Sequence, residues 1–178
     1  GDNQIAEPEM GIMNQDQSYD KKLNLLDEQG VGKIIKINLD TKKAEIFANG
    51  FRNPQGITFS INKNLFPIGH GPQGGDELNI ITEGSHYGHP VMTFGVSYGE
   101  KEYMHYNDQN FKAFRPPIYS FSPSVAPSDI LFNKSYKPLG NTSDCEFVLT
   151  TLKQESLVFM RLNNGCSNVQ NIELLDLD

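Results

Sequence analysis

The sequence lacks the features that mark membrane proteins and nucleic-acid-binding proteins. No apolar run approaches the roughly 20 residues that a membrane-spanning helix needs, which predicts that the chain does not span a membrane. Basic residues are outnumbered, with 15 lysines and arginines against 22 aspartates and glutamates, so no nucleic-acid partner is expected. The sequence also begins without a secretory leader, and this absence decides nothing about secretion.

The residues that are abundant are those of turns and short strands. Sixteen glycines and ten prolines, with many asparagines and serines, are typical of frequent turns between strands. Alternating apolar and β-branched runs predict eleven strands, at about 34–39, 43–48, 56–61, 65–69, 77–81, 91–96, 116–121, 128–133, 146–151, 156–162 and 169–175. This spacing predicts an all-β fold of about three four-stranded antiparallel sheets, preceded by an irregular segment at 1–29.

The densest group of candidate ligands is the sequence His-Gly-Pro-Gln-Gly-Gly-Asp-Glu at residues 70–77. Glycine and proline make turns whose carbonyl oxygens can face a cation, and Asp76 and Glu77 add carboxylate oxygens. These are the ligands that calcium prefers. Alternatively, the two carboxylates are simply solvated at the entrance of a strand. A phosphate-binding loop is excluded, because no Lys-Ser or Lys-Thr follows the glycines at the required place.

A second polar string, Arg-Asn-Pro-Gln-Gly, lies just upstream at residues 52–56. Arg52, Asn53 and Gln55 offer hydrogen-bond donors to an anionic, oxygen-rich partner. The same string also makes a good turn, so a purely structural role is an equal alternative on these residues alone. Together, the two strings predict calcium and a polar ligand at one site.

The order of these motifs resembles the glucose/sorbosone dehydrogenase family. Its members are sugar dehydrogenases that use pyrroloquinoline quinone (PQQ) and fold as six-bladed β-propellers. The resemblance implies that residues 30–178 form a partial six-bladed β-propeller, since 178 residues supply only about half of six blades. The segments that carry the resemblance are 32–38, 50–56, 70–77, 87–90, 124–128 and 152–153 followed by 157–162.

The resemblance also implies which residues hold the cofactor. Arg52, Asn53 and Gln55 match the motif that contacts PQQ and the substrate pocket, and Lys153 matches a lysine that meets a cofactor carboxylate. Alternatively, Lys153 is an ordinary solvated turn residue. The expected substrate is an aldose sugar, and the electron acceptor is not indicated.

Two calcium sites follow from the same resemblance. The carbonyls of Gly71 and Pro72 match a pair that ligates the calcium next to PQQ. Asp76, Glu77 and Tyr87 match positions that hold a second, structural calcium in some members. The carbonyl of His70 belongs to the same ligand set.

The catalytic base of the family is a histidine on an earlier blade. None of His70, His86, His89 and His105 stands at that position, and the family's later Arg-x-Arg pair does not match this sequence. We therefore predict no catalytic residue here, and a chain that is inactive alone in oxidising the sugar at C1 to the lactone. The alternative is a non-catalytic extracellular propeller, stabilised by calcium, that binds a carbohydrate or a protein.

Three residues depart from the family pattern. Gly69 replaces a polar residue before the His-Gly-Pro turn, His89 replaces the tryptophan of Tyr-Gly-Trp-Pro, and Asp129 replaces a glycine. Losing the tryptophan removes packing area near the site. These changes indicate a divergent member whose sugar is not readable from the sequence.

The two cysteines bear on the compartment. Cys145 and Cys166 lie just outside the two arms of a predicted hairpin, so a disulfide and two free thiols are both open. The family setting is the periplasm or the extracellular space, which permits a disulfide. Three blades would also leave two open flanks, which predicts self-association.

Overall fold

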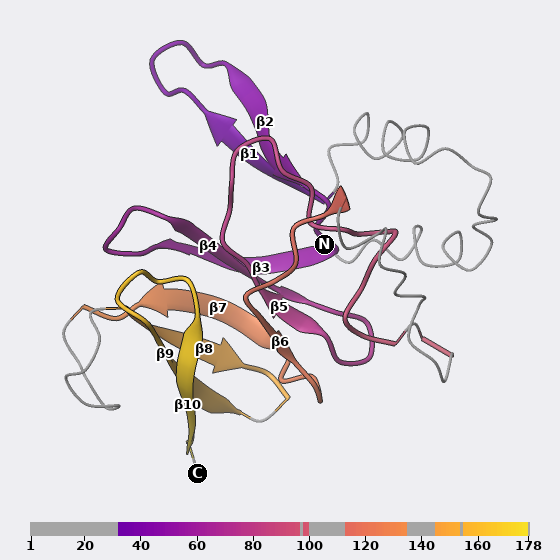
Figure 1. Ribbon diagram of the computed structural model, residues 1–178, viewed down its shortest axis with the longest axis vertical. Helices are drawn as coiled ribbons and strands as arrows, with labels where there is room; N and C mark the ends of the chain where they lie inside the picture. The colour runs from indigo at the N-terminus through magenta and orange to yellow at the C-terminus, as the bar shows by residue number, and fades with distance from the viewer. Residues whose placement is uncertain (1–31, 97, 100–112, 135–144, 154, 178) are drawn as a thin grey trace.

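The computed structural model describes residues 32–96, 98–99, 113–134, 145–153 and 155–177, which fold into three antiparallel sheets (Figure 1). The leading segment predicted at 1–29 lies outside these residues. No helix in the described ranges is long and apolar enough to cross a membrane. The ten strands are β1 (Lys33–Ile37), β2 (Ala44–Asn49), β3 (Asn53–Phe59), β4 (Leu65–His70), β5 (Asp76–Leu78), β6 (Tyr119–Phe121), β7 (Pro127–Phe132), β8 (Glu146–Thr151), β9 (Ser156–Leu162) and β10 (Val169–Asp176).

Each sheet follows the order of the sequence. The first sheet pairs β1 with β2, the second has the order β3-β4-β5-β6, and the third has the order β7-β8-β9-β10. Four-stranded sheets built in chain order are the blades of a propeller, so the prediction of a partial propeller is confirmed. Two blades have four strands, and the first has two strands within the described residues.

Ten of the eleven predicted strands are confirmed, and the strand predicted at 91–96 is wrong. The amides of Val91 and Met92 both donate to the Gly88 carbonyl at 2.8 Å, which turns the chain back on itself. Val96 makes an isolated bridge with Gln73 and joins no sheet. The outer strand of the second blade is therefore β6, which comes more than twenty residues later.

The main core fills the space between the second and third sheets. Strand β3 packs along β7, and the Phe132 amide donates across the interface to Thr58 Oγ1 at 3.3 Å. Phe66 and Phe147 meet there with ring centroids 4.7 Å apart. Burial of such side chains contributes about 1.5–3 kcal/mol each, which explains why two blades hold together. The fully buried members include Ile68, Leu78, Leu149, Val158, Met160 and Leu162.

The other faces of these inner strands are apolar and exposed. Alternation along β3 places Ile57 and Phe59 on the face opposite Thr58, and Phe59 is 63% exposed. On β7, Leu131 lies between two buried neighbours and is 66% exposed. Both inner strands therefore present apolar surface on the sides that do not face each other.

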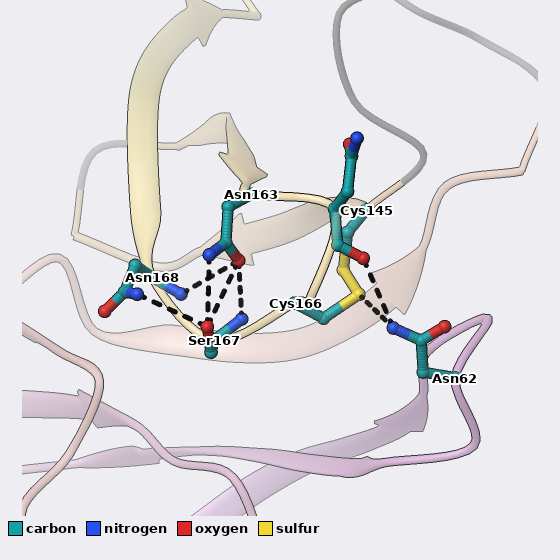
Figure 2. The surroundings of a disulfide bond; sticks show 7 residues. Asn62, Cys145, Asn163, Cys166, Ser167 and Asn168 are labelled. Carbon is teal, nitrogen blue, oxygen red and sulfur yellow. Dashed lines mark hydrogen bonds between the residues drawn. A yellow bond between two sulfur atoms is a disulfide. The ribbon is translucent and has the colours of Figure 1, made fainter.

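The strand turns gather at two ends of this pair of blades. We call the turns at residues 60–64 and 163–168, with Cys145, the disulfide end. We call residues 50–53, 70–76, 122–127 and 152–153 the loop end. At the disulfide end, Cys145 and Cys166 are bonded, with Cα atoms 5.6 Å apart, so the structure decides for the disulfide (Figure 2).

Candidate functional site

A partly open cavity at the loop end collects most of the predicted site residues. It encloses about 390 Å³, counting its mouth, and is lined by residues of both polar strings and of the Tyr-Gly-His-Pro segment. The lining includes Arg52, Asn53, Gly71, Glu77, Tyr87 and His89. The structure thus brings together three segments that the sequence singled out separately.

The guanidinium of Arg52 lies against the turn that was predicted to bind calcium. Its Nη1 donates to the carbonyls of Gly71 at 3.2 Å and of His70 at 3.5 Å. Arg52 also lies over the ring of Tyr98, 5.8 Å from the centroid. A carbonyl oxygen has two lone pairs, so a cation and the guanidinium can share the Gly71 oxygen.

Gly71 is a glycine because its backbone is crowded. A Cβ at this position would overlap the carbonyl oxygen of Gly74, so no other residue fits without moving the turn. Gly74 and Gly75 both have left-handed φ angles, of 80° and 72°. The glycine string therefore forms a tight turn, whose main-chain carbonyls are available as ligands.

Asp76 is fully buried and accepts four hydrogen bonds. The amide of Gly71 donates to Oδ1 at 3.1 Å. The Ser124 hydroxyl and the amides of Val125 and Ala126 donate to Oδ2 at 2.7, 2.8 and 2.9 Å. Both carboxylate oxygens are therefore engaged by the protein.

Glu77 lies in the cavity wall and holds its proton unusually tightly. Its pKa is raised from 4.5 to about 7, mainly by burial; the hydrogen bond from Asn79 lowers the pKa, and the charge of the neighbouring Asp76 raises it. Asn79 Nδ2 donates to Glu77 Oε2 at 3.3 Å. Within the described residues, Asn79 Oδ1 is buried without a hydrogen-bond partner. The oxygens of Glu77 and Asn79 can therefore accept a cation or a hydrogen-bond donor from a ligand.

His89 brings buried nitrogen atoms to the same cavity. The residue is 6% exposed, and neither ring nitrogen has a hydrogen-bond partner among the described residues. Its pKa is lowered from 6.5 to about 3, mainly by burial and then by the charges of Arg52 and His86. The imidazole is therefore neutral. His89 was expected to have no catalytic role and Asn79 was not among the candidate residues; the family tryptophan that His89 replaces was the signal available for His89.

Tyr87 anchors the cavity wall through its side chain. Its hydroxyl donates to the Ile80 carbonyl at 2.6 Å and accepts from the Thr82 amide at 2.8 Å. Its ring stacks on Phe51 with centroids 4.7 Å apart. Because the hydroxyl is engaged twice, a contribution of Tyr87 to the predicted cation site would come from its main-chain carbonyl.

The remaining predicted residues lie at the same end in different settings. Asn53 is buried and accepts from Gln55 Nε2 at 2.9 Å, whereas Gln55 itself is exposed. Lys153 is exposed on the turn after β8, and its amide donates to the Val125 carbonyl at 3.3 Å. This bond seats the Lys153 turn on the loop that Asp76 holds.

Histidine rings at the site are engaged or buried. His70 Nε2 lies 2.7 Å from the Pro127 carbonyl and so carries the proton. His86 Nδ1 accepts from the Gly88 amide at 3.0 Å. In the ranges that the structure describes, no group of three or more His, Cys, Asp or Glu side chains is placed to hold a metal.

Comparison with known proteins gives a consistent result. The family model described as Glucose / Sorbosone dehydrogenase matches residues 20–177. Aldose sugar dehydrogenase YliI of Escherichia coli is 34% identical over 96 residues, which are 53% of this chain and 26% of that protein.

Solved structures show the same fold. The apo form of the soluble aldose sugar dehydrogenase of Escherichia coli matches with a TM-score of 0.64 and 27% identity, over 78% of this chain and 43% of that one. The PQQ-bound aldose sugar dehydrogenase of Streptomyces coelicolor matches with a TM-score of 0.58 and 22% identity, over 81% of this chain and 39% of that one. The chain thus spans about a quarter of the curated relative and less than half of each solved structure.

Proposed function

The chain belongs to the glucose/sorbosone dehydrogenase family, and from this premise we propose that it forms the cofactor-holding part of a PQQ- and calcium-dependent aldose dehydrogenase. The proposed reaction oxidises the sugar at C1 to the lactone by hydride transfer to the quinone. One observation supports this most: the Arg52 guanidinium, the Gly71 carbonyl and the turn of Lys153 lie at the same end of two adjoining blades.

The residues proposed to hold PQQ are Arg52, Asn53, Gln55 and Lys153. PQQ is an anionic quinone with carboxylates, and two cationic side chains and two amides suit such a ligand. Lys153 is exposed and free to turn toward a carboxylate, whereas buried Asn53 is fixed by Gln55. When bound, PQQ supplies the hydride acceptor, and these residues bind and orient it.

Calcium is proposed at two places. The carbonyls of Gly71 and Pro72 would hold the cation next to PQQ, where a hard cation polarises quinone oxygens. The second set that the resemblance implies is Asp76, Glu77 and Tyr87 with the His70 carbonyl; of these, Glu77, Tyr87 and His70 are proposed as ligands, because both oxygens of Asp76 already accept hydrogen bonds from the protein. The raised pKa of Glu77 supports a cation there, because a bound cation would offset the cost of burying its negative charge.

We propose that this chain binds without turnover. One ring nitrogen of His70 and one of His86 are hydrogen-bonded to main-chain groups, and His89 is buried and neutral. His105 lies outside the described residues. The base would then come from a part of the enzyme that this chain does not span.

Two further proposals concern the setting of the chain. The disulfide supports an oxidising compartment, the periplasm or the extracellular space. The exposed apolar faces of β3 and β7 support self-association, since they are the faces by which blades pack. Sedimentation of the purified chain tests this second proposal, and a monomer at high concentration would contradict it.

The central proposal is tested by calorimetric titration of PQQ into the purified chain with calcium, then with a chelator. We expect binding that calcium strengthens. Lys153→Gln should weaken it, and Lys63→Gln is the matched control, because Lys63 is an exposed turn lysine at the opposite, disulfide end.

Other results have definite meanings. Binding that both lysine variants weaken equally would show a general charge effect and contradict the assignment of Lys153. A folded chain that binds calcium but no PQQ would favour the alternative, a non-catalytic calcium-stabilised propeller with a carbohydrate or protein partner.

A further inference from the structure

We infer that Asp76 is a positioning residue and not a cation ligand. Its carboxylate ties the Gly71 turn to the loop at 124–126, and the tie fixes the direction of the His70 carbonyl, which shares a peptide unit with the Gly71 amide. The purpose assigned to the turn, cation binding, rests on the proposed function. The tie itself rests on hydrogen bonds that are independent of any ligand.

The four donors to Asp76 come from two different blade connections. Gly71 lies between β4 and β5 of the second blade, and it donates to Oδ1. Ser124, Val125 and Ala126 lie between β6 and β7, where the chain passes to the third blade, and they donate to Oδ2. A single buried carboxylate therefore joins the loop of one blade to the entrance of the next.

Nearby contacts strengthen the same junction. The ring of His70 meets the Pro127 carbonyl at 2.7 Å, which links the residue before Gly71 to the residue after Ala126. Ala126 has a φ of 52°, a left-handed conformation that alanine rarely adopts. Such a conformation persists where surrounding bonds fix it, and here Asp76 and Leu152 bond its amide and its carbonyl.

The peptide unit between His70 and Gly71 is fixed from both sides. Its N–H, on Gly71, donates to Asp76 Oδ1 at 3.1 Å, and its carbonyl, on His70, accepts from Arg52 Nη1 at 3.5 Å. Rotation of this peptide unit would break both bonds at once. Asp76 therefore sets the direction of an oxygen that it does not touch, the His70 carbonyl.

Electrostatics argue against Asp76 as a ligand. Three main-chain N–H groups and one hydroxyl point their positive ends at its two oxygens. Oδ2 accepts three of the four bonds, so a cation at Oδ2 would have to displace a donor, and the whole carboxylate is buried. Glu77 is then the side-chain carboxylate left for the second proposed calcium, and Asp76 acts one step behind the ligands.

Calcium alone, titrated calorimetrically into the full chain, tests this inference. Asp76→Asn keeps the size of the side chain but turns one oxygen into a donor that faces other donors, so calcium affinity should fall about 10–100-fold. Ser124→Ala removes one donor and leaves the carboxylate intact. It should weaken calcium binding about 2–10-fold if the tie positions the turn.

Asp129→Asn is the matched control, because Asp129 is exposed on β7 close to the same loop and the charge change is identical. Its calcium affinity should equal that of the parent chain. The opposite pattern, in which Ser124→Ala binds calcium as tightly as the parent or more tightly while Asp76→Asn loses binding, would identify Asp76 as a ligand and overturn the inference.

Amide hydrogen exchange without calcium supplies a second readout. In Asp76→Asn, the amides of Gly71, Val125 and Ala126 should exchange faster, whereas the core amides of Leu149 and Met160 should not change. Unchanged exchange at the three loop amides would overturn the inference. If the parent chain binds no calcium, the proposed function fails, and the tie is then decided by the exchange data alone.

Discussion

The two ends of the paired blades are stabilised by different chemistry. At the disulfide end, a covalent bond joins Cys145 to Cys166, and Asn163 Oδ1 accepts from the amides of Ser167 and Asn168 at 2.8 and 3.3 Å (Figure 2). At the loop end, the largest group of bonds converges on one buried carboxylate. Three other buried polar atoms at its cavity, Asn79 Oδ1 and both ring nitrogens of His89, have no hydrogen-bond partner within the described residues, against one, Ser60 Oγ, at the disulfide end.

The difference separates stability from binding. Buried polar atoms are nearly always paired in folded proteins, and each unpaired one costs about 1–3 kcal/mol. Such atoms persist at the loop end because the core and the disulfide end hold the blades together without it. A ligand that forms hydrogen bonds with these atoms removes this cost, which favours binding at the loop end.

Removing the disulfide should cause the largest loss of stability. The double variant Cys145→Ser, Cys166→Ser opens a loop of 21 residues, which should lower the free energy of unfolding by about 3 kcal/mol through chain entropy. Urea unfolding followed by circular dichroism measures the loss. Calcium binding by the fraction that stays folded should not change, and a parallel loss of calcium affinity would show that the two ends are coupled.

The next largest effect is the pH dependence of stability that two groups at the loop end, Glu77 and His89, should produce. Between pH 4.5 and 7 the unfolded chain loses the Glu77 proton while the folded chain keeps it, so this group makes stability fall as pH rises. Between pH 3 and 6.5 the unfolded chain protonates His89 while the folded chain does not, so this group makes stability rise. The two slopes oppose each other between pH 4.5 and 6.5.

The parent chain should therefore show little change in stability across this window from these two groups. Glu77→Gln should leave a stability that rises by about 2 kcal/mol over the window, with the partial exposure of the cavity taken into account. His89→Gln should leave one that falls by a similar amount. Urea unfolding at several pH values in chelator measures both, and parallel profiles for all three chains would contradict the pKa assignments.

A turn variant at the disulfide end gives a smaller effect. Asn163→Ala removes the acceptor that closes the turn between β9 and β10, and it should cost about 1 kcal/mol. The loss should be independent of pH from 4.5 to 6.5, unlike the losses at the loop end. Urea unfolding at the two ends of this range checks both statements, and a pH-dependent loss would contradict the separation.

The smallest expected effect concerns the link between the two turns. Asn62 Nδ2 donates to the Asn164 carbonyl at 3.3 Å and lies 3.6 Å from Cys166 Sγ, on the surface. Asn62→Ala should cost no more than about 0.5 kcal/mol, because the buried aromatic contacts already join these blades. A loss above about 1 kcal/mol in urea unfolding would show that the surface link is a main contact between the sheets.

Most strands followed from the sequence because their alternation is local. The runs around Ile34 to Ile37 and Leu157 to Leu162 carry the pattern of a strand within a few residues. The failure at 91–96 has the opposite cause, since a turn on Gly88 overrides the apolar residues there. The strand propensity of these residues does not predict their hydrogen bonds to Gly88.

The candidate site was predictable as a set of residues but not as an arrangement. The strings at 52–56 and 70–77 predicted hydrogen-bond donors and carbonyl ligands, and residues of both strings line one cavity in the structure. The use of Asp76 was hidden, because three of its four partners are about fifty residues away along the chain. Asn79 carried no signal of burial, which is set by the packing of distant segments, and His89 carried only the replacement of the family tryptophan.

The position of the disulfide also makes a closed covalent ring of the segment from Cys145 to Cys166, with exposed Lys153 within the ring. A protease that cuts after Lys153 opens the ring without dividing the molecule. A chain cut only after Lys153 should therefore migrate as one piece on a denaturing gel until a reductant is added, when it separates into two. The same cut frees the Lys153 turn while the blades stay attached, so the ring offers a way to loosen the proposed cofactor contact without replacing any residue.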